Sequence, residues 1–189
     1  MKLKHAQLAG NLYDDITISE IKDGYCLLVA SHSFLAMRIQ DFQKLQNRKG
    51  GIFNHSGVFS SPFDVRSVFE ATHPACCFTD FKEYINSGSH LLIGIPAFEV
   101  DPIRFGQICL QYDGLGYEYE NLFIHQSIKF LTGKWIGRKN LKAEKRFICG
   151  ELSARVYFDY SDGTWFNDWH KLAPIDLYES KLFEWKLLK

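Results

Sequence analysis

The chain has 189 residues, of which 46% are hydrophobic and 15% aromatic, which suits a sizeable core and argues against disorder. Lysine plus arginine equals aspartate plus glutamate at 22 each, so the chain has no overall field to attract nucleic acid or an anionic membrane. We therefore expect one globular domain over residues 1–189 that does not bind nucleic acid.

The five cysteines include an adjacent pair, and an odd number makes a poor disulfide framework, which suits a reducing compartment. The start, Met1 to Gln7, is basic but lacks the apolar stretch of a secretory signal, and no later segment approaches the length of a membrane span. These features predict a cytoplasmic protein without stable membrane insertion.

In the first half of the chain, turn signals alternate with short apolar runs. Asp23-Gly24 marks a turn before a strand from Tyr25 to Ala30. A helix capped by Ser31 or Ser33 should follow, because apolar side chains recur at near-helical spacing up to the break at residues 47–51. Two extended runs, Phe53 to Phe59 and Val65 to Glu70, come next.

The second half predicts mainly helices, with strands between and after them. The expected elements are a short helix capped by Thr79, a strand from Leu91 to Ile95, a helix from Asp101-Pro102 to about Gly114, a helix from about Tyr117 to Leu131 ending at Gly133, a helix from Cys149 to Asp162-Gly163, a helical turn at Pro174 to Leu177 and an apolar run from Leu182 to Leu188. Strands and helices do not alternate with the rhythm of a parallel doubly wound sheet, so the pattern favours the α+β class.

His55 and Glu70 lie on the two neighbouring extended runs. If Ser60 to Val65 is a hairpin loop, Phe59 pairs with Arg66 and His55 lies directly opposite Glu70. Cross-strand partners have Cβ atoms roughly 4.5 to 5.5 Å apart, close enough for a carboxylate to orient an imidazole. A register slip of one residue would place the two side chains on opposite faces.

Cys149 opens a predicted helix, where unpaired backbone amides and the helix dipole stabilise a thiolate. The same amides could bind the oxyanion formed when a thiolate attacks an acyl carbon. With His55 as base and Glu70 as its partner, this predicts a Cys-His-Glu hydrolase whose nucleophile comes last in the chain.

A basic segment precedes Cys149. Lys134 to Arg146 carries six basic residues and one acid, Glu144, for a local charge of +5. The segment could lower the pKa of the thiol slightly or attract an anionic substrate. Alternatively, it is a solvated loop whose charges are screened over about 8 to 10 Å.

Other readings of these residues remain open at this stage. Cys149 shares a helix face with Leu152 and Val156, as a core cysteine would. His55, Glu70 and Cys149 could also hold a metal ion, but the spacing of Thr72 to Cys77 does not predict a zinc site, and we expect no metal and no cofactor. There is no nucleotide-binding fingerprint.

Six short pieces occur in an order that spans roughly residues 22 to 180: Gly24–Val29, Asn54–Val58, Phe69–Ala71, Gly116–Tyr119, Cys149–Leu152 and Pro174–Leu177. In these pieces the chain resembles the permuted papain-like cysteine hydrolases, most closely the YiiX-type amidase family, which is related to the NlpC-type cell-wall endopeptidases. The resemblance implies a circularly permuted papain-like fold, with a small antiparallel sheet and the nucleophile helix near the C-terminus.

The resemblance also implies Cys149 as nucleophile, His55 as base and Glu70 as the residue that orients the base. Gly150 stands where the family usually has serine, and its N–H is a candidate oxyanion donor. Tyr117 either hydrogen-bonds within the site or belongs to the core.

The expected reaction is cleavage of an amide, in a peptide or cell-wall peptide, through an acyl-enzyme. A lipid or fatty-acyl hydrolase or acyltransferase on the same triad is the alternative enzyme, and it would need an apolar groove beside Cys149. In a third reading the fold only binds a peptide. The sequence does not indicate the oligomeric state.

Overall fold

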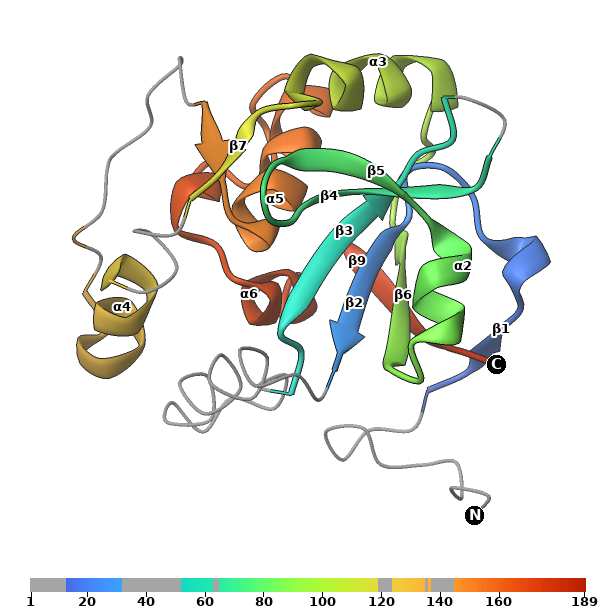
Figure 1. Cartoon of the computed structure of the whole chain (residues 1–189), viewed down its shortest axis with the longest axis horizontal. Helices are drawn as coiled ribbons and strands as arrows, with labels where there is room; N and C mark the ends of the chain where they lie inside the picture. The colour runs from blue at the N-terminus through green and yellow to red at the C-terminus, as the bar shows by residue number, and fades with distance from the viewer. Residues whose placement is uncertain (1–12, 32–51, 63–64, 119–123, 135, 137–144) are drawn as a thin grey trace.

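The computed structural model describes residues 13–31, 52–62, 65–118, 124–134, 136 and 145–189. In this part of the chain, seven strands form one sheet in the order β1-β9-β6-β2-β3-β4-β5 (Figure 1). Neighbouring strands are antiparallel except for β1 and β9, which are parallel. The strands are β1 (Asp15–Ile16), β2 (Cys26–Ala30), β3 (His55–Phe59), β4 (Ser67–Ala71), β5 (Cys76–Asp80), β6 (His90–Pro96) and β9 (Phe183–Leu188).

Helices and a second, two-stranded sheet surround this larger sheet. The helices are α2 (Phe81–Asn86), α3 (Pro102–Tyr112), α4 (Gln126–Thr132), α5 (Cys149–Tyr160) and α6 (Pro174–Tyr178), with 3₁₀ turns η1 (Ile18–Glu20) and η3 (Trp169–Lys171). The small sheet joins β7 (Gly116–Tyr117) to β8 (Arg146–Phe147) in parallel.

Alternation along β2 divides the apolar side chains between two cores. Cys26, Leu28 and Ala30 belong to the larger core, which includes side chains of α3 and α5. Leu27 and Val29 belong to a smaller core on the α2 side. Because both faces are covered, β2 is apolar throughout. In Figure 1, α5 lies behind β3 and β4, and the two strands both contact it.

The mixed arrangement confirms the α+β class, and several predicted boundaries are confirmed. The helix at Asp101-Pro102 begins as predicted, because the Asp101 carboxylate accepts hydrogen bonds from the N–H groups of Ile103 (2.9 Å) and Arg104 (3.3 Å). Gly133 ends α4 in the left-handed region, with φ 72°. Circular permutation of the fold stays a prediction.

The predicted register between the two strands that carry His55 and Glu70 was wrong by two residues. Phe59 pairs with Val68, not with Arg66. If this register is continued along both strands, His55 and Glu70 are diagonal neighbours instead of directly opposed residues, and their side chains meet. Because the shift is an even number of residues, both side chains stay on the same face.

Two further predictions were wrong. Thr79 does not cap a helix, since it lies within β5, a strand that was not predicted, and Asp80 caps α2 by accepting from the Lys82 N–H at 2.9 Å. Tyr117 does not begin a helix, because it lies on β7 and α4 starts later, at Gln126.

The predicted helix that follows Ser31 falls at residues 32–51, outside the described residues. None of the helices in the described ranges is both long enough and apolar enough to span a bilayer.

Candidate active site

Cys149 is the first residue of α5, so its sulfur lies at the positive end of the helix. The backbone N–H groups of Ser56 and Gly150 favour the thiolate and help to lower the pKa of Cys149. The chain enters α5 through Ile148, whose N–H donates to the buried carboxylate of Glu151 at 3.2 Å. The start of α5 is therefore fixed by its own cap, with the thiol at its positive end.

Two buried serines join the start of α5 to β3. The hydroxyl oxygens of Ser56 and Ser153 lie 3.1 Å apart, and the Ser153 hydroxyl also donates to the backbone carbonyl of Cys149 at 3.0 Å. Since Ser56 follows His55 directly, these bonds fix the thiol-bearing helix relative to the imidazole-bearing strand.

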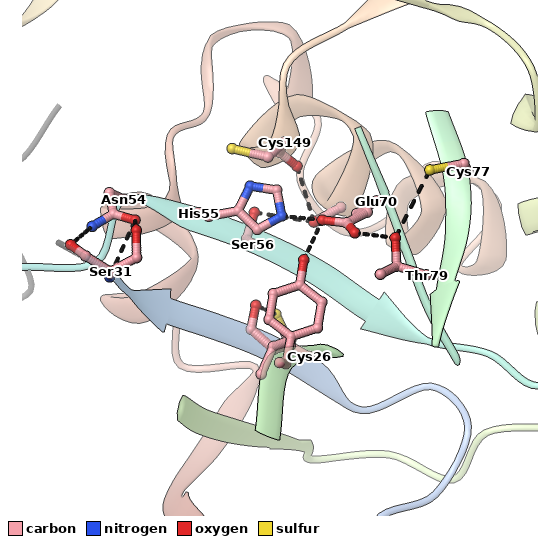
Figure 2. Close-up of polar contacts among 12 residues, drawn as sticks. Cys26, Ser31, Asn54, His55, Ser56, Glu70, Cys77, Thr79 and Cys149 are labelled. Atoms are coloured by element: carbon pink, nitrogen blue, oxygen red, sulfur yellow. Dashed lines mark hydrogen bonds and ion pairs between the residues drawn. The ribbon is translucent and has the colours of Figure 1, made fainter. Parts of the chain in front are cut away.

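His55 is the first residue of β3, and its ring lies between Cys149 and Glu70 (Figure 2). Its Nε2 bonds to Oε2 of Glu70, which leaves Nδ1 for the thiol of Cys149. The preceding residue, Asn54, is anchored to the end of β2, because its amide donates to the Ser31 carbonyl (3.0 Å) and accepts from the Ser31 hydroxyl (3.1 Å).

Glu70 reaches His55 at a point where β3 and β4 no longer pair. Their ladder stops at Val58 and Phe69, whereas β4 stays paired to β5 along its whole length. Gly57 leaves room for the carboxylate here, because a Cβ at this position would lie 3.3 Å from the Cβ of Glu70 and 2.4 Å from Val68.

Two hydroxyl groups that the sequence analysis missed also bind Glu70. Thr79 on β5 donates to Oε1, and Tyr84 on α2 donates to Oε2. A signal for Thr79 was present: Glu70 pairs with Cys77, and Thr79 follows two residues later on the same face. Nothing local in the sequence indicates that Tyr84 bonds to Glu70.

The charges of these groups shift one another. Burial opposes an imidazolium at His55, but the negative charges of Glu70 and Cys149 outweigh it and raise the pKa of His55 to about 10. Burial likewise disfavours the thiolate, yet His55 and the two N–H donors hold the pKa of Cys149 below its ordinary value. Burial would raise the pKa of Glu70, but His55, Thr79 and Tyr84 lower it. The arrangement favours a thiolate paired with an imidazolium.

The other four cysteines differ from Cys149 in the direction of their pKa shifts. Burial raises the pKa of Cys26 and Cys109 far above the ordinary value and that of Cys76 to about 12. Cys77 is half-buried, and its pKa is raised, chiefly by burial. Cys149 alone among the five has a lowered pKa.

A pocket of about 400 Å³ adjoins His55 on the side of Glu70 and α2. Most of its exposed wall is carbon, but the residues that line it include several with hydroxyl or carboxylate groups: Ser31, Glu70, Thr72, Thr79, Glu83, Tyr84, Ser87 and Ser89. The side chain of His55 is 22% exposed, whereas Cys149 is only 4% exposed and does not line the pocket. The pocket therefore approaches the thiol–imidazole pair from the imidazole side.

Gly150 packs directly against the backbone that precedes α6. A Cβ here would lie 2.5 Å from the carbonyl oxygen of Leu172 and 2.8 Å from the backbone of Ala173. The close approach explains why this chain has glycine at the second position of α5.

Tyr117 lies in the small sheet, where it pairs with Phe147, two residues before Cys149, and its ring packs against the larger core. This contact places Tyr117 in the support of the α5 start. A substrate contact for Tyr117 and an oxyanion role for Gly150 stay predictions.

The predicted basic segment lies largely outside the described residues, since only 134, 136, 145 and 146 of it are described. Among residues 13–31, 52–62, 65–118, 124–134, 136 and 145–189, no group of three or more His, Cys, Asp or Glu side chains is placed to hold a metal ion.

No family model matches the chain, and no curated protein matches it. Among solved structures, the metalloprotein YiiX from Escherichia coli O157:H7 is similar, with a TM-score of 0.51 and 14% sequence identity over 87% of this chain and 95% of that one. This chain has a YiiX-like fold. At this identity the likeness to YiiX concerns the fold alone, and the arrangement of Cys149, His55 and Glu70 rests on the chain's own geometry.

Proposed function

We propose that this protein is a cysteine hydrolase that cleaves an amide bond through an acyl-enzyme, with Cys149, His55 and Glu70 as its triad. The observation that carries the proposal is the convergence of a thiol at a helix start with an imidazole whose other nitrogen is bonded to a buried carboxylate. Nucleophile, base and orienting group in this arrangement are the requirements of thiol-based acyl transfer.

In the proposed reaction, the Cys149 thiolate attacks the substrate carbonyl and the N–H of Gly150 donates to the developing oxyanion. Imidazolium at His55 then protonates the leaving amine, and the acyl group stays on sulfur. A water molecule, deprotonated by His55, releases the acid and returns the thiol. Glu70 fixes the tautomer of the ring and stabilises its charge.

Hydroxyl and carboxylate groups in the wall of the pocket beside His55 can hydrogen-bond the backbone of a peptide, and we therefore propose a peptide amide. A lipid acyl chain has no groups that would pair with them. Purified protein should therefore hydrolyse short peptide amides faster than fatty-acyl esters, and mass spectrometry should detect an acyl group on Cys149.

Reactivity of the cysteines tests the triad. Cys77 is more exposed than Cys149, so exposure alone predicts that Cys77 reacts first with iodoacetamide, whereas a stabilised thiolate predicts Cys149 first. We expect selective alkylation of Cys149 near neutral pH, reduced at least about tenfold in His55→Ala. Equal, slow alkylation of all five cysteines would overturn the proposal and favour a non-catalytic binding module.

A further inference from the structure

Two hydroxyl groups bind the two oxygens of the Glu70 carboxylate. Thr79 donates to Oε1, and Tyr84 donates to Oε2, the oxygen that also bonds His55. We infer that Thr79 and Tyr84, here called the hydroxyl clamp, are positioning residues that keep Glu70 ionised and aimed at His55. The inference rests on the proposed function and deepens it.

The clamp has a physical task because Glu70 is almost completely buried. Its side chain is 4% exposed, and burial without hydrogen bonds would favour the neutral acid. Within the described residues, His55 is its ion-pair partner, and the remaining stabilisation comes from the two hydroxyl dipoles. A protonated Glu70 would no longer stabilise imidazolium, and the thiolate would lose its counter-charge in turn.

Tyr84 also constrains the imidazole ring itself. The two rings are nearly parallel, with an interplanar angle of 14° and centroids 6.3 Å apart. Tyr84 is held in place because α2 is capped by Asp80 and anchored by the buried Phe81. The same side chain thus restrains the carboxylate and the plane of its partner ring.

The clamp can be tested through the pH dependence of Cys149 alkylation by iodoacetamide in the full chain. Tyr84→Phe keeps the ring and removes the hydroxyl, and Thr79→Val removes the other donor. In each variant we expect the acidic limb of the rate profile to move up by about one pH unit, which makes alkylation about tenfold slower below the midpoint. A merely structural role would lower the melting temperature without moving this limb.

Tyr25→Phe is the matched control, because Tyr25 packs against the smaller core and no hydrogen bond joins its hydroxyl to Glu70. Tyr25→Phe should keep the wild-type profile. Thr79→Ser retains a hydroxyl group and should also keep the wild-type profile, in contrast to Thr79→Val. Should Tyr84→Phe fail to fold, the contrast between Thr79→Val and Thr79→Ser decides the matter.

The two proposals fail in different ways. Unchanged profiles in both Tyr84→Phe and Thr79→Val would overturn the clamp, while selective, His55-dependent alkylation of Cys149 still supported the triad. Absence of that His55-dependent reactivity in the wild-type protein would instead overturn the proposed function.

Discussion

At the scale of single residues, Cys149 and His55 set the pH range in which the proposed chemistry can run. The pKa of Cys149 lies below its ordinary value of 9.0, and that of His55 is raised to about 10. Turnover should therefore rise with pH as the thiol loses its proton and fall near pH 10 as imidazolium can no longer protonate the leaving amine.

Initial rates on a peptide amide across this pH range check the expectation. His55→Ala should abolish turnover of the amide, and in the alkylation assay its rising limb should move toward the pKa of an ordinary thiol. A wild-type rate that rose only around the ordinary thiol pKa and kept rising above pH 10 would contradict it.

The close packing around Gly150 predicts the effect of a substitution at this position. Gly150→Ala places a methyl group 2.5 Å from a backbone carbonyl, so we expect a loss of stability of about 1 to 3 kcal/mol in urea unfolding, together with lower activity because the α5 start must shift. Gly106 on α3 is the control, since its nearest contact to an added Cβ is 3.5 Å, to Ser60. Gly106→Ala should be neutral or stabilising; equal losses in both variants would contradict the steric explanation.

At the scale of elements, two helix caps should have different consequences. Asp80 caps α2, which carries Tyr84, whereas Asp101 caps α3, which carries none of the triad or clamp residues. Replacing either aspartate with alanine should cost about 1 kcal/mol of stability in chemical unfolding. Only Asp80→Ala should also shift the pH profile of Cys149 alkylation, and the same shift in Asp101→Ala would show that a general loss of stability causes it.

Pattern-based reasoning succeeded where a local signal defines an element. The Asp-Pro pair marked the start of α3, and Gly133 marked the end of α4. His55 and Glu70 were correctly assigned to one face, because alternation fixes the parity of a strand even when the register is shifted by two residues.

The errors arose where distant parts of the chain decide the structure. β7 forms because Gly116 and Tyr117 pair with Arg146 and Phe147, about 30 residues later in the chain. No local pattern around Tyr117 indicates this pairing, so the segment was predicted as a helix. β5 is stabilised by a full ladder with β4, but its Cys-Cys start conceals the alternation that would predict a strand. With β5 unpredicted, Thr79 was taken for a helix cap and its bond to Glu70 was missed.

At the scale of the whole molecule, the candidate site exists only when several distant contacts form together. The pairing of β3 and β4 must end at Val58, and Gly57 must leave space for Glu70. The hydroxyl of Ser153 must also bind Ser56, which holds α5 against β3. The sequence could name the three groups and their order, but their convergence depends on this packing, which no single segment encodes.

Because Glu70 is buried and ionised, the folded molecule should be linked to pH through it. Its pKa in the folded state lies below the ordinary 4.5, so its contribution to stability is complete above about pH 4.5 and is lost as pH falls through the folded value. Urea unfolding at about pH 6 and about pH 3 measures this loss.

Glu70→Gln should be less stable than wild type near pH 6, and its free energy of unfolding should fall less on acidification, because an amide does not titrate. Glu83→Gln, which removes an exposed carboxylate of α2, should keep the wild-type dependence. An acid-induced loss in Glu70→Gln as large as that of the wild type would show that the linkage arises elsewhere in the molecule.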